Sequence, residues 1–252
     1  MSAIPQLCKT LRIANLEALA EDVEFENPEQ YLTALLELAV EQRSTNRVQR
    51  LIQQARFPPM DMSRSYSYDN ISFPDRLDAE ELMTLEFLKQ KENLCFFGPC
   101  GTGKTRLAVM LGLKACQKGY SVQFYRTVDL VNMLVEAYEK GRAKTALAAI
   151  AKCHMLVLDE IGYIPFSKRA AEMLFSVISQ GYQSQTIVTT SNLEFGRWNE
   201  VFGDDRLTAA LIDRIVHRSN ILGFSGPSRR FEEAMAKRSP NSKGPTTKNE
   251  EE

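Results

Sequence analysis

The chain has 252 residues and carries 31 basic and 32 acidic side chains, for a net charge of -1, while 44% of its residues are hydrophobic. This composition excludes a wholly disordered or collagen-like chain, and the length suits one large domain with a small appendage. The near-zero charge excludes a protein that coats nucleic acid through bulk electrostatics, so such binding has to come from local patches. Because no apolar run reaches membrane-spanning length and no signal peptide is evident, we expect a cytoplasmic protein.

Cysteines and histidines narrow the chemistry further. The five cysteines are scattered without a C-x-x-C pair, and the two histidines are His154 and His217. The pattern predicts neither a disulfide framework nor a zinc site. Each histidine lies in or beside an element that should be buried, which favours a structural role and disfavours triad-type hydrolysis.

Residues 1–60 have helical periodicity and are predicted to form a small all-α N-terminal domain. A helix should begin near Asn27, which can cap it, with Pro28 in the first helical position. It should end before Pro58. Residues 61–91 then form a linker and the start of the next domain.

Arginines recur in the second half of this helix at steps of three, four and six residues, which places much of the charge on one face. Two interpretations remain open, a solvated face and a strip that binds nucleic-acid phosphates. The arginines are Arg43, Arg47, Arg50 and Arg56.

Residues 92–226 alternate short apolar runs with helical stretches at 104–117, 129–151 and 167–182. This alternation is typical of an α/β fold, and we expect a five-stranded parallel sheet with helices on both faces. Residues 227–252 are polar and should form a disordered tail, which leaves no room for a C-terminal helical lid. The expected strands are Leu94–Phe97, Val122–Tyr125, Met155–Leu158, Ile187–Thr190 and Ile221–Phe224.

A phosphate-binding loop directly follows the first of these strands and opens a helix, because the sequence GPCGTGKT satisfies G-x-x-x-x-G-K-[ST]. Glycines let backbone N–H groups turn inward around a phosphate, and the helix N-terminus adds partial positive charge. Lys104 should reach the β- and γ-phosphates, and the Thr105 hydroxyl should ligate Mg²⁺. The residues expected to hold the nucleotide are Gly98, Pro99, Cys100, Gly101, Thr102, Gly103, Lys104, Thr105 and Arg106.

Two carboxylates end the apolar strand MLVLDE about fifty residues later. Asp159 is predicted to hold Mg²⁺, and Glu160 to orient and deprotonate the water that attacks the γ-phosphate. A D-E pair after a phosphate loop favours an ATP-hydrolysing machine over a small-molecule kinase, which needs no water-activating glutamate. A third strand ends at Asn192, which either contacts the γ-phosphate or lytic water or is a turn residue.

Three segments carry a resemblance to a known family. The AAA+ ATPases use a phosphate loop, an acidic strand and a polar sensor strand in this order. Within them, GPCGTGKTRLA, LVLDEIGYIPF and TIVTTSNLEFGRWNEVFGDDRLTAALIDRIVHRS resemble the IstB family, over about residues 1–226. IstB proteins are helper ATPases of insertion-sequence transposition and are related to the helicase loader DnaC. One departure is Arg106, which stands where the family pattern has a histidine.

The resemblance implies roles for three further residues. Asn192 takes the sensor role, and Arg214 matches the arginine finger that reaches the γ-phosphate of a neighbouring subunit. Arg218, expected on the same helix, is a second candidate. Both could instead be surface or salt-bridged arginines, for instance with Asp213. A finger acting in trans makes hydrolysis depend on assembly into a homo-oligomer, either a ring or a helical filament.

The expected partners are double-stranded DNA and a cognate transposase, and the expected function is ATP-dependent help in transposition. Alternatives are a DnaC-like helicase loader and a nucleotide switch that does not hydrolyse ATP. Phosphate contacts add up over many subunits, so a near-neutral protomer can bind DNA once assembled. Besides the four arginines above, the candidates for DNA contact are Lys140, Arg142, Lys144, Lys168 and Arg169.

Overall fold

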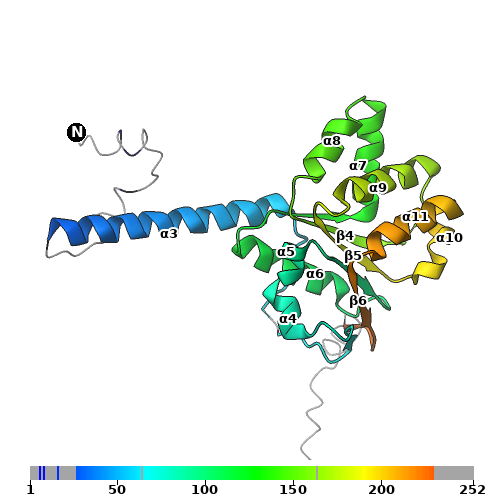
Figure 1. The fold of residues 1–252 in the computed structure, drawn as a ribbon, viewed down its shortest axis with the longest axis horizontal. Helices are drawn as coiled ribbons and strands as arrows, with labels where there is room; N and C mark the ends of the chain where they lie inside the picture. Colours follow the sequence, from blue (N-terminus) through cyan, green and yellow to red (C-terminus); the bar gives the residue numbers. More distant parts are fainter. Residues whose placement is uncertain are drawn as a thin grey trace, which may run out of the picture.

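The computed structural model describes residues 27–63, 65–162 and 164–229, together with positions 6, 8 and 16. Within them, a six-stranded sheet carries helices on both faces, and one long helix, α3 (Pro28–Ala55), runs outward from this core (Figure 1). Every helix in the described ranges is too short or too polar to cross a membrane.

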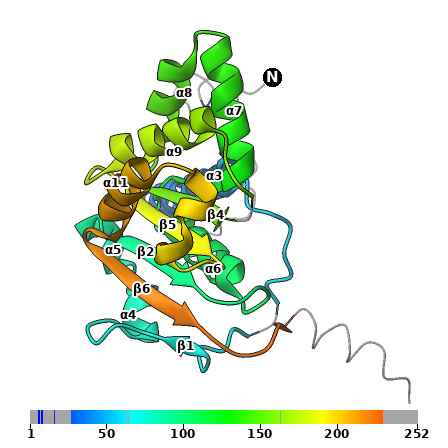
Figure 2. The ribbon, with the colours of Figure 1, turned by 90° about the vertical axis from the view of Figure 1, so that its right-hand side faces the viewer.

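The sheet has the strand order β1-β6-β2-β5-β4-β3. Its five parallel strands are β2 (Asn93–Phe97), β3 (Val122–Arg126), β4 (Met155–Ile161), β5 (Thr186–Ser191) and β6 (Ser219–Phe224). The predicted total of five strands was wrong, because β1 (Ile71–Ser72) adds an antiparallel strand beside β6 at one edge (Figure 2). Two residues give no alternation for a sequence pattern to detect.

The helices follow the predicted periodicity with one correction. The stretch 129–151 is two helices, because the chain turns at Gly141, whose φ is +67°. The helices of the core are α4 (Ala79–Thr84), α5 (Glu86–Gln90), α6 (Lys104–Gln117), α7 (Thr127–Glu139), α8 (Ala143–Ile150), α9 (Lys168–Gly181), the 3₁₀ turn η1 (Phe195–Arg197), α10 (Asn199–Phe202) and α11 (Asp205–Val216).

Two apolar cores lie on the two faces of the sheet, because successive strand residues point to opposite sides. Leu94 and Phe96 pack with α4, α5, α6 and the end of α3 in one core. Cys95 packs with α7, α9, α10 and α11 in the other. The prediction of helices on both faces is confirmed, and both cores end at the edge of the sheet where the phosphate loop begins.

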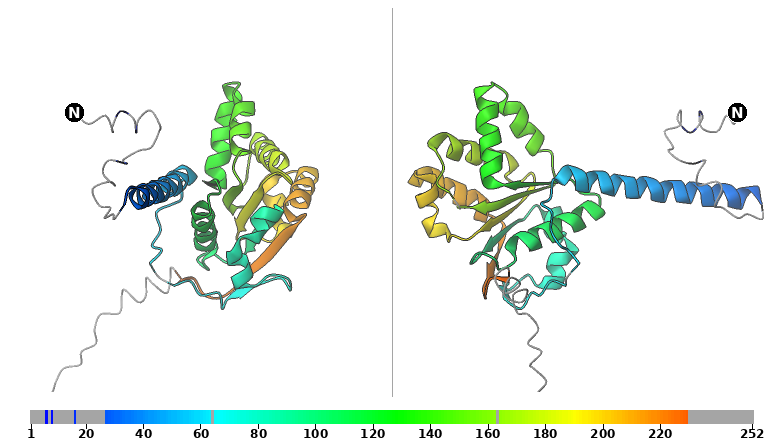
Figure 3. Two further views of the ribbon diagram at one scale, coloured as in Figure 1. Left: turned by 60° about the vertical axis from the view of Figure 1, so that its left-hand side comes forward. Right: turned by 180° about the vertical axis from the view of Figure 1, so that it is seen from behind.

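Helix α3 begins at the predicted place, because the Asn27 side chain accepts a hydrogen bond from the backbone N–H of Gln30 at 2.9 Å. Its C-terminal end reaches the core, where Ala55 is buried, and the view from behind shows the remainder extending away (Figure 3, right). Leu32 and Val40 on the extended part are 56% and 69% exposed.

Three predictions concern residues that the structure does not describe. Most of residues 1–26 lie outside the described ranges, so the predicted all-α N-terminal domain stays a prediction. The same holds for the tail over residues 230–252 and for the missing lid.

Candidate nucleotide site

The phosphate loop connects β2 to α6 and is built on a close approach to β6. Gly98 has a φ of +145°, and a Cβ at this position would overlap the carbonyl group of Phe224. Glycine is therefore the residue that this turn accepts. Helix α6 begins at Lys104, so its free N–H groups and the positive end of its dipole face the loop.

Lys104 lies inside the loop and is 8% exposed. Its Nζ donates hydrogen bonds to the carbonyl oxygens of Gly98 at 2.6 Å and Pro99 at 2.7 Å. The ammonium group is thereby held where a phosphate would meet it, and phosphate oxygens can take over these bonds as stronger, charged acceptors.

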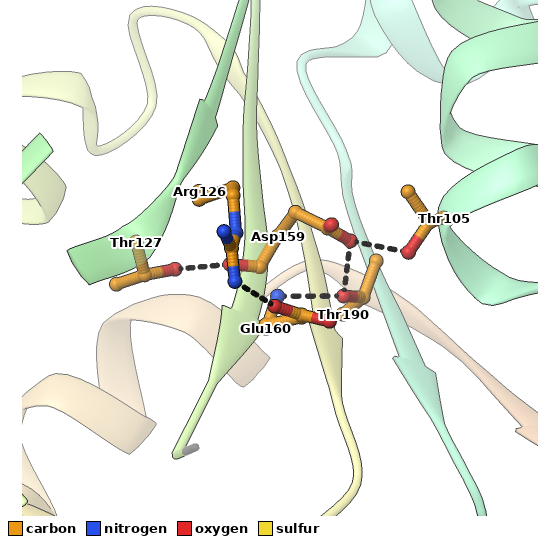
Figure 4. Close-up of polar contacts among 6 residues, drawn as sticks. All are labelled: Thr105, Arg126, Thr127, Asp159, Glu160 and Thr190. Carbon is orange, nitrogen blue, oxygen red and sulfur yellow. Dashed lines mark hydrogen bonds and ion pairs between the residues drawn. The ribbon is translucent and has the colours of Figure 1, made fainter. Parts of the chain in front are cut away.

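Asp159 is the centre of the polar network at the carboxyl ends of the strands (Figure 4). Its Oδ1 accepts hydrogen bonds from the hydroxyl groups of Thr105 at 2.8 Å and Thr190 at 2.7 Å. Burial raises the pKa of this carboxyl group, and the two hydroxyl donors act in the opposite direction.

Hard oxygen donors of this kind suit a magnesium ion. Mg²⁺ in nucleotide sites is held by one or two carboxylates together with hydroxyl groups, phosphates and water. Asp159 and the Thr105 hydroxyl supply such a pair at the start of the phosphate loop. Among the described residues no cluster of three or more acidic, cysteine or histidine ligands occurs.

Glu160 pairs with Arg126, and neither Asp159 nor Thr105 is a partner of its carboxylate in the described contacts. Its φ is +59°, the strand is irregular here, and its backbone N–H donates to the Thr190 hydroxyl at 2.9 Å. The carboxylate forms an ion pair with Arg126 at 3.0 Å, beside a cleft of about 210 Å³ that Asp129 and Ile164 also line. Arg126 therefore holds the Glu160 carboxylate in a cleft that Asp159 also lines.

Three further residues of the site were not predicted from the sequence: Arg126, Thr127 and Thr190. The Thr127 hydroxyl donates to the backbone carbonyl of Asp159 at 2.8 Å, and Arg126 pairs in register with Asp159 in the neighbouring strand. A signal was available, because parallel strands end at one edge and polar residues that follow adjacent strands meet there.

Comparison with known proteins identifies the family of the chain. The family described as "IstB-like ATP binding protein" matches residues 6–237 of the chain. The chain belongs to this family. This match confirms the resemblance to the IstB family that the three sequence segments indicated.

Its relatives come from insertion sequences. The chain is 35% identical to the IS5376 ATP-binding protein of Geobacillus stearothermophilus over 204 residues, which is 81% of each protein. It is 28% identical to the IS232 ATP-binding protein of Bacillus thuringiensis subsp. berliner over 241 residues, 92% of this chain and 96% of that one.

Two solved structures have a similar fold. The crystal structure of DnaI matches with a TM-score of 0.51 at 18% identity, over 72% of this chain and 100% of that chain. Domain III of the Thermotoga maritima replication initiation protein DnaA matches with a TM-score of 0.51 at 19% identity, over 71% and 74%. At such identities the likeness shows the α/β fold alone.

Asn192 follows β5 directly and is exposed at the same edge of the sheet as the phosphate loop. The turn that carries it is fixed, because the Ser191 hydroxyl donates to the carbonyls of Ile161 at 2.8 Å and Leu193 at 3.0 Å. The sensor role implied by the family stays a prediction.

Arg214 lies far from the phosphate loop of its own subunit. Its guanidinium contacts the Ser179 hydroxyl and lies 4.4 Å above the Phe175 ring on α9. Ser219, five residues after Arg214, pairs with Asn93, the first residue of β2. The phosphate loop instead follows Phe97, the last residue of β2, so the two lie at opposite ends of this strand. The role of Arg214 as a finger for another subunit stays a prediction.

Arg218 is not on the same helix, contrary to our expectation. Helix α11 ends at Val216, and Arg218 has a φ of +58° in the connection to β6. Its guanidinium donates a hydrogen bond to the carbonyl of Gln90 at 3.0 Å and so ties this connection to the end of α5.

The arginines of α3 form one group of candidate DNA contacts. Arg43 and Arg50 are exposed on the helix, while Arg47 donates to the carbonyl of Gly119 at 3.4 Å. Arg56 stands at the end of the helix with a φ of +60° and so leaves the helical face.

The other candidates form a second group on the opposite face of the sheet, since α7, α8 and α9 pack in the other core. The Arg169 guanidinium lies 4.3 Å above the Tyr138 ring, which brings the start of α9 beside the end of α7. A single surface therefore does not hold all the predicted contacts. The members of this group are Lys140, Arg142, Lys144, Lys168 and Arg169.

Both histidines have structural contacts. His154 Nδ1 lies 2.7 Å from the Ser121 hydroxyl, and His217 Nδ1 lies 3.0 Å from the Tyr182 hydroxyl. Neither imidazole takes part in the Asp159 network.

Proposed function

We propose that this protein is an ATPase that assists transposition, oligomerises on double-stranded target DNA, recruits or activates a partner transposase, and hydrolyses ATP at subunit interfaces. The observation that carries the proposal is the bond from Thr105 to Asp159, which joins the phosphate loop to the acidic strand. Its relatives are named as ATP-binding proteins of insertion sequences, which gives the activity its context.

The geometry supports a division of labour around the γ-phosphate. Lys104 neutralises the β- and γ-phosphate oxygens from inside the loop, and Thr105 and Asp159 would hold Mg²⁺. The ion would polarise the phosphate oxygens when bound. Glu160 accepts the proton of the attacking water as the bond between the γ-phosphorus and the bridging oxygen breaks, giving ADP and phosphate.

Glu160 has to leave Arg126 before it can act as this base. The ion pair is accessible to solvent, with side chains 61% and 36% exposed, so releasing it costs less than about 1 kcal/mol. A small change at the carboxyl edge of β3 is therefore enough to free the base.

Hydrolysis at a subunit interface is supported by the position of Arg214. The Arg214 guanidinium cannot reach the phosphate loop of its own subunit. It can stabilise the negative charge on a γ-phosphate only when that nucleotide is bound to a neighbouring subunit, which requires assembly. Assembly also adds up the basic groups of many near-neutral subunits along one DNA duplex.

The test is the ATPase rate per protomer as protein concentration and duplex DNA are varied, for the wild type, Glu160→Gln and Arg126→Ala. We expect the wild-type rate to rise with both. Glu160→Gln should bind ATP but lose roughly 100-fold or more in rate, as for a general base. Arg126→Ala should raise the DNA-free rate by up to about fivefold, because it frees Glu160.

Two results would contradict the proposal. A wild-type rate that is flat in protein concentration and indifferent to DNA would remove the interface mechanism. An unchanged rate in Glu160→Gln would remove Glu160 as the base. Capture of the transposase from the same insertion sequence, with a replicative helicase as the control, tests the partner.

A further inference from the structure

The chain that follows β6 returns to the phosphate loop. The backbone N–H of Arg229 donates to the carbonyl oxygen of Gly101 at 3.0 Å. Gly101 has a φ of +80°, and a Cβ there would overlap the side chain of Ser228. The loop glycine is thus needed both for its backbone angle and for the close approach of this segment.

A second segment, in front of β1, meets the loop beside the first. The Tyr66 hydroxyl donates to the carbonyl of Gly103 at 3.2 Å, and the Arg229 guanidinium lies 4.9 Å above the Tyr66 ring. The same guanidinium donates to the Ser67 carbonyl at 2.8 Å, which ties the two segments together. We refer to Tyr66, Ser67, Ser228 and Arg229 as the collar.

The two hydrogen bonds to the loop fix the direction of two peptide planes. In a planar trans peptide the C=O of one residue and the N–H of the next point in opposite directions. A bond that holds the Gly101 carbonyl against the collar therefore turns the Thr102 N–H the other way. The Gly103 carbonyl accepts from the Tyr66 hydroxyl and also from the Leu107 N–H at 3.0 Å. Holding this carbonyl outward turns the Lys104 N–H toward the inside of the loop.

We propose that Tyr66 and Arg229 are positioning residues of the phosphate loop, which hold the carbonyls of Gly101 and Gly103 outward so that the following N–H groups face the phosphates. Loops that bind phosphate depend on such converging N–H groups. The inference rests on the proposed ATPase function and deepens it, because it makes nucleotide affinity depend on a segment after the last strand. Burial raises the pKa of Tyr66 to about 12, so its hydroxyl remains a donor at neutral pH.

The experiment measures ADP affinity by calorimetry, and KM and kcat for ATP, on the full-length chain. Tyr66→Phe removes one donor and keeps the ring. Arg229→Pro removes the backbone N–H, and Arg229→Ala is its matched control because it keeps that N–H. Tyr68→Phe is the matched control for the tyrosine, since Tyr68 packs against Tyr66 with ring centroids 5.0 Å apart.

We expect Tyr66→Phe and Arg229→Pro each to weaken ADP binding roughly fivefold, the loss of about one hydrogen bond. KM for ATP should rise by the same factor while kcat stays unchanged, because Asp159 and Glu160 are not touched. A purely structural role would lower the melting temperature without this split. Tyr68→Phe should bind ADP as the wild type does. Arg229→Ala keeps the backbone N–H but loses the guanidinium contacts to Tyr66 and Ser67, so it should lose less ADP affinity than Arg229→Pro.

The inference is overturned if Tyr66→Phe and Arg229→Pro bind ADP as the wild type does. It is also overturned for Arg229 if Arg229→Ala is as weak as Arg229→Pro, since the guanidinium would then carry the effect. If Arg229→Pro fails to fold, the nearly isosteric Tyr66→Phe decides. A wild-type protein that binds no ADP would instead defeat the proposed function, and the inference with it.

Discussion

Asp159 determines how the candidate site behaves when no cation is bound. Its side chain is only 4% exposed, and this burial raises its pKa. The hydroxyls of Thr105 and Thr190 stabilise the ionised form, but they do not cancel the effect of burial. The negative charge therefore destabilises the folded chain, and a cation beside Thr105 would offset this cost.

We predict that Asp159→Asn stabilises the nucleotide-free protein at neutral pH while removing the cation ligand. A carboxyl group with a raised folded pKa contributes stability below its unfolded pKa of 3.8, and this contribution is lost as pH rises through the folded pKa. The melting temperature of the variant should therefore exceed that of the wild type at about pH 8 and approach it toward about pH 4.

The matched control is Asp129→Asn on the exposed start of α7, which should lack this pH-dependent gain. Scanning calorimetry without magnesium or nucleotide measures both variants. A gain in Asp159→Asn that is the same at every pH, or a loss at neutral pH, would show that burial does not govern this carboxyl group.

Among single residues, the sequence predicted those whose role depends on a local motif. Lys104 and Thr105 belong to one contiguous motif at the start of α6, and Asp159 lies near the end of a strand whose apolar pattern is plain. Arg126 and Tyr66 could not be assigned in this way, because each acts through a partner that is distant in sequence. Their contacts arise from sheet register and from the return of the chain after β6.

At the scale of elements, prediction succeeded where the repeat was long. Helix α6 begins and ends where its periodicity does, and the five parallel strands each carry an apolar run. It failed for β1, which has two residues, and at Gly141, where two helices with similar apolar spacing meet. Arg218 was placed on α11 because the pattern gave no sign of the left-handed turn there.

Helix α3 permits a prediction at this scale, because its N-terminal half extends from the core. The Asn27 side chain caps its first turn by accepting from the Gln30 N–H. Asn27→Ala should cost the helix end about 1 kcal/mol and speed amide exchange in the first turns roughly fivefold. The melting temperature of the core should stay unchanged.

Asn27→Asp, which keeps the cap, is the control for hydrogen exchange measured by mass spectrometry. If Asn27→Ala leaves exchange in the first turns as in the wild type, the end of α3 is held by other contacts. If it lowers the melting temperature of the core, α3 and the sheet unfold as one unit.

At the scale of the whole molecule, the sheet separates the parts that the proposed function has to connect. The nucleotide loop and Asp159 lie at the carboxyl edge of the strands, and Arg214 lies toward the opposite edge. The two basic groups lie over opposite faces. Under the proposed function, each protomer has its own nucleotide pocket at one end and offers Arg214 to the pocket of a neighbour at the other end. This arrangement suits head-to-tail assembly.

This arrangement predicts that two inactive variants restore hydrolysis when mixed. Arg214→Ala keeps an intact nucleotide pocket but offers no finger, whereas Lys104→Ala offers a finger but has a damaged pocket. In a mixed assembly, Lys104→Ala subunits supply Arg214 to the pockets of Arg214→Ala subunits. With equal amounts and random order, about a quarter of interfaces are complete, so roughly a quarter of the wild-type rate per total protomer should return.

Arg218→Ala is the control, because Arg218 bonds to Gln90 in its own chain. This variant should hydrolyse ATP without a partner variant. If the mixture stays inactive while both variants still assemble, Arg214 does not act across the interface.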